Sequence, residues 1–307
     1  MKKIALIFPG QGAQKVGMGK ELYDHSSAAK AVFEQANALM GEDLASIIFE
    51  GPDDKLMATS YCQPAIFTVS MAALAAFRST DKWAALSVTY TAGLSLGEYG
   101  AMCAAGVLSF QDTLKLIRQR GAFMEEAARI NPGKMAAIIG FDKDKLVNIC
   151  RQTGCEVANF NAPDQIVITG AGTAVDQACL LIIEAGGKKV IPLDVSGAFH
   201  SSLMRSAADK FTHALVETPL VISDIKVVSN VTAKPGLSAE EVRTNLPRQI
   251  YSSVQWVDSI RYIASAGVTD FIEIGPGRVL KGLIRKIDPA LNVANIQTWD
   301  DIELFAL

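Results

Sequence analysis

A serine between two glycines is the segment of the chain best suited to chemistry. Residues 93–97 read Gly-Leu-Ser-Leu-Gly, after a β-branched and aromatic run and before a helix-compatible one. In a strand-turn-helix setting, the glycines permit a sharp turn that exposes the serine, and the next backbone N–H faces the carbonyl under attack. The pattern therefore predicts that Ser95 is a nucleophile and that the amide of Leu96 is one oxyanion donor.

A serine hydroxyl needs a neighbouring base, which is usually a histidine. The chain has three histidines. His25 lies in a polar stretch between helical patterns, where a surface position is expected, and His213 falls in the middle of a predicted helix as a solvent-facing or packed side chain. His200 lies in a loop at residues 196–201, where functional side chains are commonly displayed, and it is the predicted base.

The sequence leaves open which group orients His200. Asp194 and several later carboxylates are alternatives, and a backbone carbonyl could take the same role. A second oxyanion donor must come from another strand-end loop, and Gly-Gln-Gly at residues 10–12 is the obvious one. The glycine spacing there fits neither the dinucleotide nor the phosphate-loop pattern, so nucleotide binding is disfavoured.

Composition is that of an ordinary globular protein. The 307 residues are 50% hydrophobic, which is enough for one large core and a smaller one. The net charge of −3 gives no excess of positive charge with which to bind nucleic acid or an anionic membrane. The longest largely apolar stretch, 65–77, is too short to span a bilayer. We therefore expect neither a nucleic-acid partner nor membrane insertion.

The cysteines indicate a reducing compartment. They are odd in number and lack metal-binding spacing, so we expect reduced thiols, a cytoplasmic location and no metal site. The five are Cys62, Cys103, Cys150, Cys155 and Cys179.

Apolar periodicity predicts an α/β fold in two parts. The first part has strands at 3–8 and 87–91 and helices at 28–40, 64–77 and 109–129, with Pro64 at a first helical position. From 133 to 195 the order becomes β-α-β-β-α-β, which is ferredoxin-like. The α/β pattern then returns, with helices at 201–217, 239–250, 259–266 and 279–287 and strands at 225–229, 270–274 and 292–296.

We therefore predict a large α/β-hydrolase-like domain with a parallel-sheet core, formed by residues 1–129 and 196–307. A small ferredoxin-like α+β domain, residues 130–195, interrupts it. A cleft between the two domains is the expected site.

Five segments together resemble the malonyl-CoA:acyl-carrier-protein transacylase family. They occur in the family's order, with the ferredoxin-like insertion in the expected place, and the resemblance extends to about residue 287. The segments are FPGQG at 8–12, GLSLGEY at 93–99, QRGAFM at 119–124, GAFHS at 197–201 and EIGPG at 273–277.

The resemblance implies roles for the matched residues. Ser95 would attack the thioester of malonyl-CoA, His200 would take the hydroxyl proton, and the amides of Gln11 and Leu96 would hold the oxyanion. Arg120 would bind the free malonyl carboxylate. A guanidinium fork suits this role because it can bind a carboxylate through two parallel hydrogen bonds.

Other matched positions concern the pocket around these groups. Gln249 matches a family position where a main-chain carbonyl accepts from the imidazole, which would explain the missing acid. Phe199 would narrow the pocket beside the malonyl α-carbon and disfavour methylmalonyl. Asn159 and Asn161 resemble the small domain's contribution to the cleft, although asparagines at a strand end are also common turn formers. Leu94 departs from the histidine of many relatives, so a polar role of that side chain is absent.

The implied reaction is a two-step, ping-pong transfer. Ser95 would take malonyl from malonyl-CoA, and the phosphopantetheine thiol of acyl carrier protein would remove it, supplying the extender unit for fatty acid synthesis. No cofactor or metal is needed, and a monomer is expected. Acyl carrier proteins are acidic, so a basic face could receive one. The residues considered for this face are Lys188, Lys189, Lys281, Arg285 and Lys286.

Two other functions remain open at this point. A serine hydrolase would share the glycine-serine turn but would let water resolve the acyl-enzyme. A non-catalytic binding module could also keep the fold. The presence of Ser95, His200 and Arg120 together argues against the module, because a scaffold has no physical need for all three.

Overall fold

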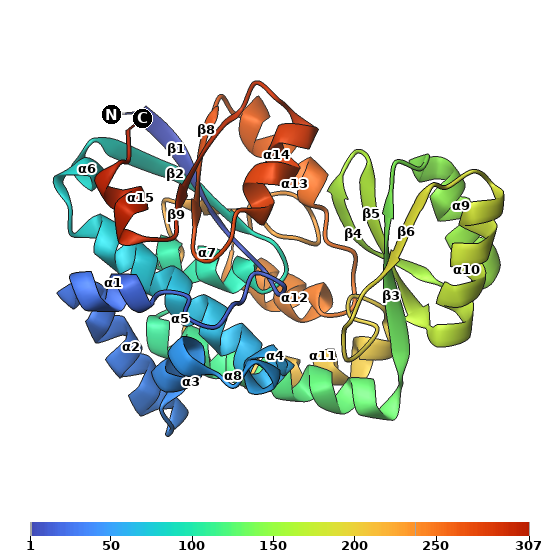
Figure 1. Ribbon diagram of the computed structural model, residues 1–307, viewed down its shortest axis with the longest axis horizontal. Coiled ribbons are helices and arrows are strands. Elements are labelled where there is room, and N and C mark those ends of the chain that lie inside the picture. The colour runs from blue at the N-terminus through green and yellow to red at the C-terminus, as the bar shows by residue number, and fades with distance from the viewer. Residues whose placement is uncertain (1, 237, 307) are drawn as a thin grey trace.

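A parallel sheet forms the centre of the larger part of the molecule (Figure 1). The computed structural model describes residues 2–236 and 238–306. Every pair of neighbouring strands in this sheet is parallel, and the strand order is β7-β2-β1-β8-β9. The strands are β1 (Lys2–Phe8), β2 (Leu86–Gly93), β7 (Lys226–Val227), β8 (Asp270–Ile274) and β9 (Asn292–Ile296).

Strand β1 divides two apolar cores, one on each face of the sheet. Ile4, Leu6 and Phe8 belong to a core shared with helices α5 (Thr59–Arg78) and α8 (Phe110–Ile130). Ala5 and Ile7 belong to a second core, shared with α13 (Trp256–Ser265) and α14 (Val279–Ile287). Successive strand residues point to opposite faces, so this alternation buries both faces of the sheet, as expected of a parallel sheet.

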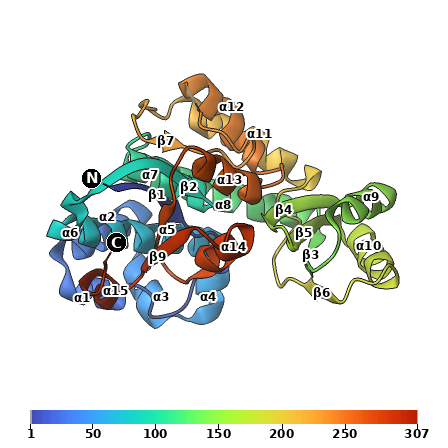
Figure 2. The ribbon, with the colours of Figure 1, turned by 90° about the horizontal axis from the view of Figure 1, so that it is seen from above.

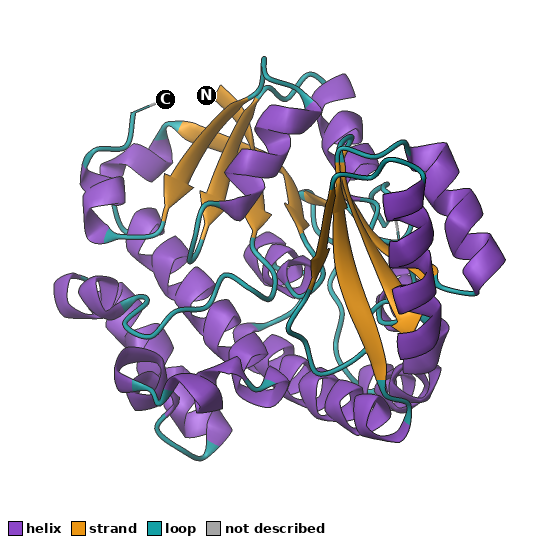
Figure 3. Ribbon diagram, turned by 45° about the vertical axis from the view of Figure 1, so that its right-hand side comes forward, coloured by secondary structure: helices purple, strands orange, loops and turns teal. Residues whose placement is uncertain are grey.

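A second, antiparallel sheet stands at one end of the molecule (Figure 2). Its strand order is β4-β5-β3-β6, and the chain passes through it as β-α-β-β-α-β, which confirms the predicted element order. Figure 3 shows the two sheets as separate groups of strands with helices alongside. The elements are β3 (Gly133–Ile139), α9 (Lys143–Thr153), β4 (Glu156–Ala162), β5 (Gln165–Ala171), α10 (Gly172–Glu184) and β6 (Lys189–Pro192).

The two faces of the second sheet have different neighbours. Ala136 and Ile138 of β3 pack with residues of α9 and α10 in a small core. Met135 and Ala137 belong instead to the large core of the first sheet. One face of the second sheet is therefore turned toward the larger part of the molecule. All strands of this sheet lie within the predicted domain 130–195, although the boundaries themselves remain a prediction.

Further helices surround the first sheet. A short 3₁₀ helix at Ser202–Met204 precedes α11. The remaining helices are α1 (Lys20–His25), α2 (Ser27–Met40), α3 (Leu44–Glu50), α4 (Asp53–Met57), α6 (Asp81–Ala84), α7 (Gly97–Ala105), α11 (Arg205–Val216), α12 (Ala239–Gln249) and α15 (Trp299–Glu303).

The prediction that Pro64 begins a helix is wrong. Helix α5 begins at Thr59 and continues through Pro64, which has no N–H to donate to the preceding turn. Extensive burial compensates for one missing hydrogen bond, because most of this helix lies inside the fold. Of the described residues, this is the one helix long and apolar enough to cross a membrane, and 83% of its apolar window is buried in the protein.

Two other predicted elements are shorter in the structure. The helix expected at 201–217 starts with the 3₁₀ turn and becomes α-helical at Arg205. The strand expected at 225–229 pairs over Lys226–Val227 only, because the chain then turns and Ser229 N–H donates to the Lys234 carbonyl instead. The apolar pattern of residues 225–229 gives no indication of this turn.

The turn between β2 and α7 requires two glycines. A Cβ on Gly93 would lie 1.9 Å from the Gly97 carbonyl carbon, and a Cβ on Gly97 would lie 2.1 Å from the Phe8 carbonyl oxygen. Backbone atoms cannot move aside as a flexible side chain can. The close approach of three backbone segments therefore excludes any side chain at either position.

We predict that Gly97→Ala lowers the free energy of unfolding by about 1–3 kcal/mol or more, because the added methyl overlaps backbone. Gly282→Ala is the matched control: Gly282 lies in α14 with no atom within 4 Å of its Cβ position. That variant should be more stable by up to about 1 kcal/mol, since alanine favours helix. Denaturant unfolding followed by circular dichroism measures both. Equal stability of the two variants would contradict the close-approach argument.

Candidate active site

The carboxyl ends of β1 and β2 bring two loops together. The strands pair in register up to Phe8 opposite Gly93, and the Leu94 N–H donates to the Phe8 carbonyl at 3.1 Å. Both strands end at the same edge of the sheet, which is the edge where parallel α/β sheets bind their ligands. The Gln11 loop and the Ser95 turn therefore adjoin one another by the construction of the sheet.

A cavity of about 810 Å³ lies at this edge. Gln11, Ser95 and His200 line it from the larger part of the molecule. Met135 of β3 and Asn159 of β4 line it from the second sheet. The expected cleft between the two parts is therefore present.

Ser95 and His200, the predicted nucleophile and base, are in hydrogen-bond contact. The Ser95 Oγ lies 2.8 Å from the His200 Nε2, and the two residues are 105 positions apart in sequence. Both have left-handed backbone conformations, with φ of 54° at Ser95 and 59° at His200. Such angles are uncommon for residues other than glycine and are found at sites where the surrounding structure holds a side chain in place.

A main-chain carbonyl orients the imidazole. The His200 Nδ1 lies 2.8 Å from the Gln249 carbonyl oxygen. A carbonyl can only accept, so Nδ1 carries the proton and Nε2 is left free to accept from the serine hydroxyl. This contact resolves the open choice of orienting group: Asp194 lines the cavity, but the Nδ1 partner is the Gln249 carbonyl.

The environment keeps His200 neutral. Burial lowers the pKa of His200 to about 4, and the positive charge of Arg120 acts in the same direction. The Gln249 carbonyl opposes the shift, because it accepts from the protonated ring. An imidazole with this pKa is unprotonated near neutral pH, which is the form that a general base requires.

Arg120 points its guanidinium at the serine from α8. Its Nη2 donates to the Ser95 Oγ at 3.1 Å and to the Gln249 Oε1 at 3.0 Å. Its Nη1 donates to the Gln63 Oε1 at 2.8 Å. The side chain is 1% exposed, and its guanidinium lies 5.4 Å from the centre of the Tyr99 ring. A buried cation thus lies beside the predicted nucleophile and lines the cavity.

The other predicted residues also reach this site. Gln11, Leu96 and Phe199 line the cavity, as do Asn159 and Asn161 of β4. The side-chain Oδ1 of Asn161 is buried and has no hydrogen-bond partner among the described residues. His25 and His213 are exposed on the surface, as residues of α1 and α11.

Sequence reasoning missed three polar residues that support the site. Gln63 holds Arg120, while Glu98 and Asn230 lie behind the serine turn. Two of them carried a weak signal: Gln63 interrupts an apolar run, and Glu98 is a charge at the start of a largely apolar helix. Asn230 follows the short strand β7 and carried no signal of its own.

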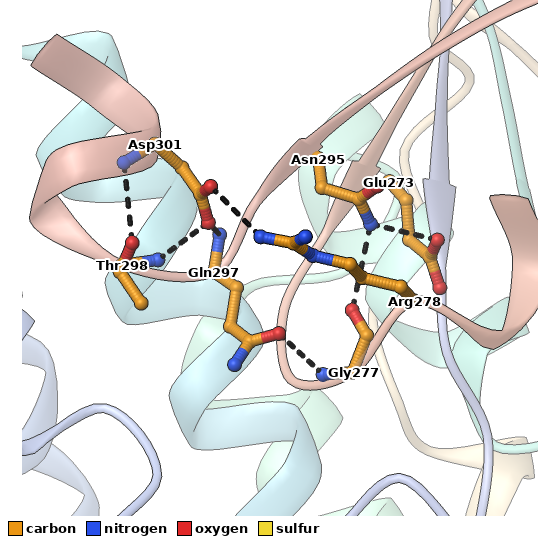
Figure 4. A network of polar contacts seen from close by, with 7 residues as sticks. All are labelled: Glu273, Gly277, Arg278, Asn295, Gln297, Thr298 and Asp301. Carbon is orange, nitrogen blue, oxygen red and sulfur yellow. Dashed lines mark hydrogen bonds and ion pairs between the residues drawn. The ribbon is translucent and has the colours of Figure 1, made fainter. Parts of the chain in front are cut away.

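The EIGPG segment supports the site from outside the cavity. The Glu273 carboxylate accepts from the amides of Leu280 and Lys281, at 3.0 and 2.9 Å, and so caps the start of α14. A Cβ on Gly275 would lie 2.2 Å from the Ser70 Oγ, so the loop packs closely on α5. Figure 4 shows a network of hydrogen bonds that fixes this loop to the C-terminal segment. Its members are Glu273, Gly277, Arg278, Asn295, Gln297, Thr298 and Asp301.

The cysteines and carboxylates form no evident metal site. Across residues 2–236 and 238–306, no group of three or more histidine, cysteine or acidic side chains is placed to hold a metal ion. All five cysteines are free thiols. The prediction that the reaction needs no metal or cofactor stays a prediction.

The chain belongs to the acyl transferase domain family, whose sequence model matches residues 5–297. It is 43% identical over 309 residues to the malonyl CoA-acyl carrier protein transacylase of Bacillus subtilis strain 168, covering 99% of this chain and 96% of that protein.

Solved structures agree over the same length. An acyl-carrier-protein-S-malonyltransferase from Bartonella henselae superposes with a TM-score of 0.93 at 38% identity, covering 99% of this chain and 98% of that one. A malonyl-transacylase solved in complex with its type II PKS acyl-carrier protein gives a TM-score of 0.93 at 35% identity, covering 98% of both chains. The predicted α/β fold and the predicted family are confirmed.

We predict that the rate at which a fluorophosphonate modifies Ser95 stays high down to about pH 5 and falls as pH drops through about 4, the pKa of His200. Arg120→Ala should move this acidic limb to higher pH, because the charge that helps to lower the His200 pKa is gone. Intact-mass measurement of the modified fraction gives the rates.

Arg118→Ala is the control, because it removes an exposed cation from the same helix. The pH at which its modification rate falls should match that of the unmodified chain. A limb near the ordinary histidine pKa of about 6.5 in the unmodified chain would contradict a neutral, buried imidazole.

Proposed function

We propose that the chain transfers the malonyl group of malonyl-CoA to the phosphopantetheine thiol of acyl carrier protein through a malonyl ester on Ser95. The buried Arg120 guanidinium, 3.1 Å from the Ser95 Oγ, carries the proposal. A fixed cation beside the nucleophile is the feature that an acyl group with a free carboxylate requires and that an acetyl group does not.

Acylation follows from the contacts around the serine. The Ser95 hydroxyl passes its proton to the His200 Nε2 as Oγ attacks the thioester carbonyl. The amides of Gln11 and Leu96 stabilise the oxyanion. When the tetrahedral intermediate collapses, the carbon-sulfur bond breaks and the CoA sulfur takes the proton from His200. The malonyl ester remains on Ser95.

Deacylation reverses the roles. The carrier thiol gives its proton to the His200 Nε2 as its sulfur attacks the ester carbonyl, and Ser95 leaves and regains the proton. The Gln249 carbonyl holds the imidazole through both half-reactions, because it stabilises the protonated ring that forms each time. Neither step needs a cofactor or a metal.

Arg120 and Phe199 set the acyl preference in this proposal. The amide oxygens of Gln63 and Gln249 hold the guanidinium in the cavity wall, so its position precedes the arrival of the substrate. Phe199 lines the same cavity and narrows the space beside the malonyl α-carbon, which favours malonyl over methylmalonyl. Leu94 adds an apolar wall where a polar contact is absent.

The second sheet contributes acceptors for the long arm of the substrate. Asn159 and Asn161 of β4 line the cavity, and the unpartnered Oδ1 of Asn161 can accept from an N–H of the pantetheine arm. The proposed domains are residues 1–129 with 196–307, and residues 130–195. The substrate would bind between them.

A basic face remains the proposed contact for the acidic carrier protein. Lys281, Arg285 and Lys286 lie on α14, and Lys189 begins β6. Lys286 already forms an ion pair with Asp164 at 3.2 Å, so part of its charge is used within the chain. We propose a cytoplasmic monomer, in keeping with five free thiols.

We predict that labelled malonyl-CoA leaves a malonyl ester on Ser95, and that adding a holo acyl carrier protein moves the label to the carrier. Intact-mass spectrometry follows both species. Ser95→Ala should abolish both, because the nucleophile is gone. Release of free malonate without labelled carrier would replace the transferase with a hydrolase, and absence of any ester under fresh substrate would favour a binding module.

We predict that Arg120→Ala lowers kcat/KM for malonyl-CoA by about 10- to 100-fold, the loss of hydrogen bonds to a charged group. Transfer from acetyl-CoA should change far less, since acetyl has no carboxylate to bind. Arg118→Ala again serves as the control, being an exposed arginine of the same helix. An equal loss with both substrates would mean that Arg120 acts on the serine alone and not on the carboxylate.

A further inference from the structure

We propose that Glu98 is a positioning residue for this transfer. Its buried carboxylate fixes the side-chain amide of Gln249 so that an oxygen faces Arg120, and it is the resident negative charge that the incoming malonyl carboxylate must accommodate. The inference rests on the proposed function, because the group being positioned is the cation that binds malonyl.

The contacts of Glu98 lie directly behind the serine turn. Glu98 is in the first turn of α7 and is 1% exposed. Its Oε2 accepts from the side-chain Nε2 of Gln249 at 2.9 Å and from the backbone N–H of Asn230 at 3.2 Å. The same Gln249 nitrogen also donates to the Ser95 carbonyl oxygen at 2.7 Å. Both hydrogens of this amide are thus directed to acceptors.

These acceptors decide which way the amide points. With its nitrogen toward Glu98 and Ser95, Gln249 presents Oε1 to the Arg120 Nη2 at 3.0 Å. A flipped amide would set its oxygen against a carboxylate and a carbonyl, and its NH₂ against a guanidinium. All three contacts would then be repulsive, whether Glu98 is ionised or carries its proton on Oε1, because Oε2 is an acceptor in both states. Glu98 therefore helps to exclude the flip. Because the Gln249 carbonyl also holds His200, one residue links the base and the cation.

Glu98 supports the nucleophile by a second route through Asn230. The Asn230 Oδ1 accepts from the Ser95 N–H at 2.7 Å, and its Nδ2 donates to the Gly93 carbonyl at 2.7 Å. The Asn230 backbone is in turn held by Glu98. The left-handed conformation of Ser95 is therefore fixed by an asparagine that depends on the same carboxylate.

The charge of Glu98 acts on Arg120 through the intervening amide. Burial raises the pKa of Glu98 to about 7, while the hydrogen bonds from Gln249 and Asn230 and the charge of Arg120 oppose the rise. The titratable groups around Glu98 are Tyr99 on its own helix and Arg120 on α8, with Asp224, Lys226 and Glu241 around a second cavity of about 270 Å³ that Glu98 also lines. His200 is linked to Glu98 through Gln249, which contacts both. A cavity of this size has room for water, which would let the carboxyl exchange a proton.

The sign of the pH effect follows from these charges. Malonyl adds a second negative charge beside Arg120, so it binds best when Glu98 is protonated. As pH rises through about 7, Glu98 ionises and the affinity for malonyl falls. Acetyl-CoA carries the same CoA without the carboxylate and should not show this trend.

Two substitutions separate orientation from charge. In Glu98→Gln, the side-chain oxygen can accept the same two hydrogen bonds, but the charge is absent. In Glu98→Ala, both the orientation and the charge are lost. Glu126→Gln is the matched control, because it removes a partly exposed carboxylate that pairs with Lys210 outside the cavity.

The readout is the ratio of KM for malonyl-CoA to KM for acetyl-CoA between about pH 6 and about pH 9. We expect this ratio to rise about tenfold in the unmodified chain and in Glu126→Gln, and to stay flat in Glu98→Gln. Glu98→Ala should lose most of the discrimination at every pH and have a lower kcat, because Gln249 can then flip.

The outcomes distinguish this inference from the proposed function. If the unmodified chain forms no malonyl ester on Ser95, the proposed function fails whatever the variants do. If it forms the ester but Glu98→Gln keeps the pH trend of the unmodified chain, the charge role of Glu98 is wrong. If folded Glu98→Ala keeps full discrimination, the positioning role is wrong. Should Glu98→Ala not fold, the pH trend of Glu98→Gln decides the charge role. Gln249→Met, which lacks the amide that Glu98 orients, then tests the positioning role, and full discrimination in that variant would contradict it.

Discussion

Burial of a positive charge beside Ser95 is the constraint on which the candidate site depends. Arg120 is 1% exposed, and an isolated buried cation is costly unless its donors are satisfied. Two amide oxygens and the serine hydroxyl accept from its two terminal nitrogens, and a carboxylate lies one amide further away, while its Nε has no hydrogen-bond partner among the described residues. The same charge helps to lower the pKa of His200, so a base held by a carbonyl stays neutral. The cation and the base therefore belong to one electrostatic arrangement.

The fold makes this arrangement from segments that are far apart in sequence. Parallel pairing of β1 and β2 delivers the Gln11 loop and the serine turn to one edge, and the glycines at 93 and 97 let the turn pack against β1. Helix α8 supplies Arg120, and the end of α12 supplies Gln249. The second sheet closes the cavity with the face that α9 and α10 leave uncovered. The first sheet, the helices and the second sheet thus each contribute either a wall of the cavity or a functional group of the candidate site.

Residues marked by a local pattern can be predicted from the sequence, whereas residues brought together by long-range contacts cannot. The role of Ser95 can be predicted because a glycine lies two residues away on either side, and that of His200 because its loop follows the inserted unit. Only the family resemblance points to Gln249, because a contact through a backbone carbonyl places no constraint on the residue type. Glu98 and Asn230 meet across 132 positions, which no periodicity can indicate. Pro64 was misplaced because its helix is stabilised by tertiary burial, which outweighs the local rule for proline.

Transfer and hydrolysis share the same acyl-enzyme, so the difference lies in which nucleophile reaches the ester. The His200 Nε2 can activate a thiol or a water equally well, and the contacts at Ser95 do not discriminate between them. Under the proposed function the difference lies in the cavity: its volume of about 810 Å³ leaves room for more than an acyl group, and its walls come from both sheets. A long, thin thioester arm can fill that space and displace water from the ester. In the proposed function, the second sheet favours transfer by shaping the path to Ser95, while the chemistry at the serine would be the same for either nucleophile.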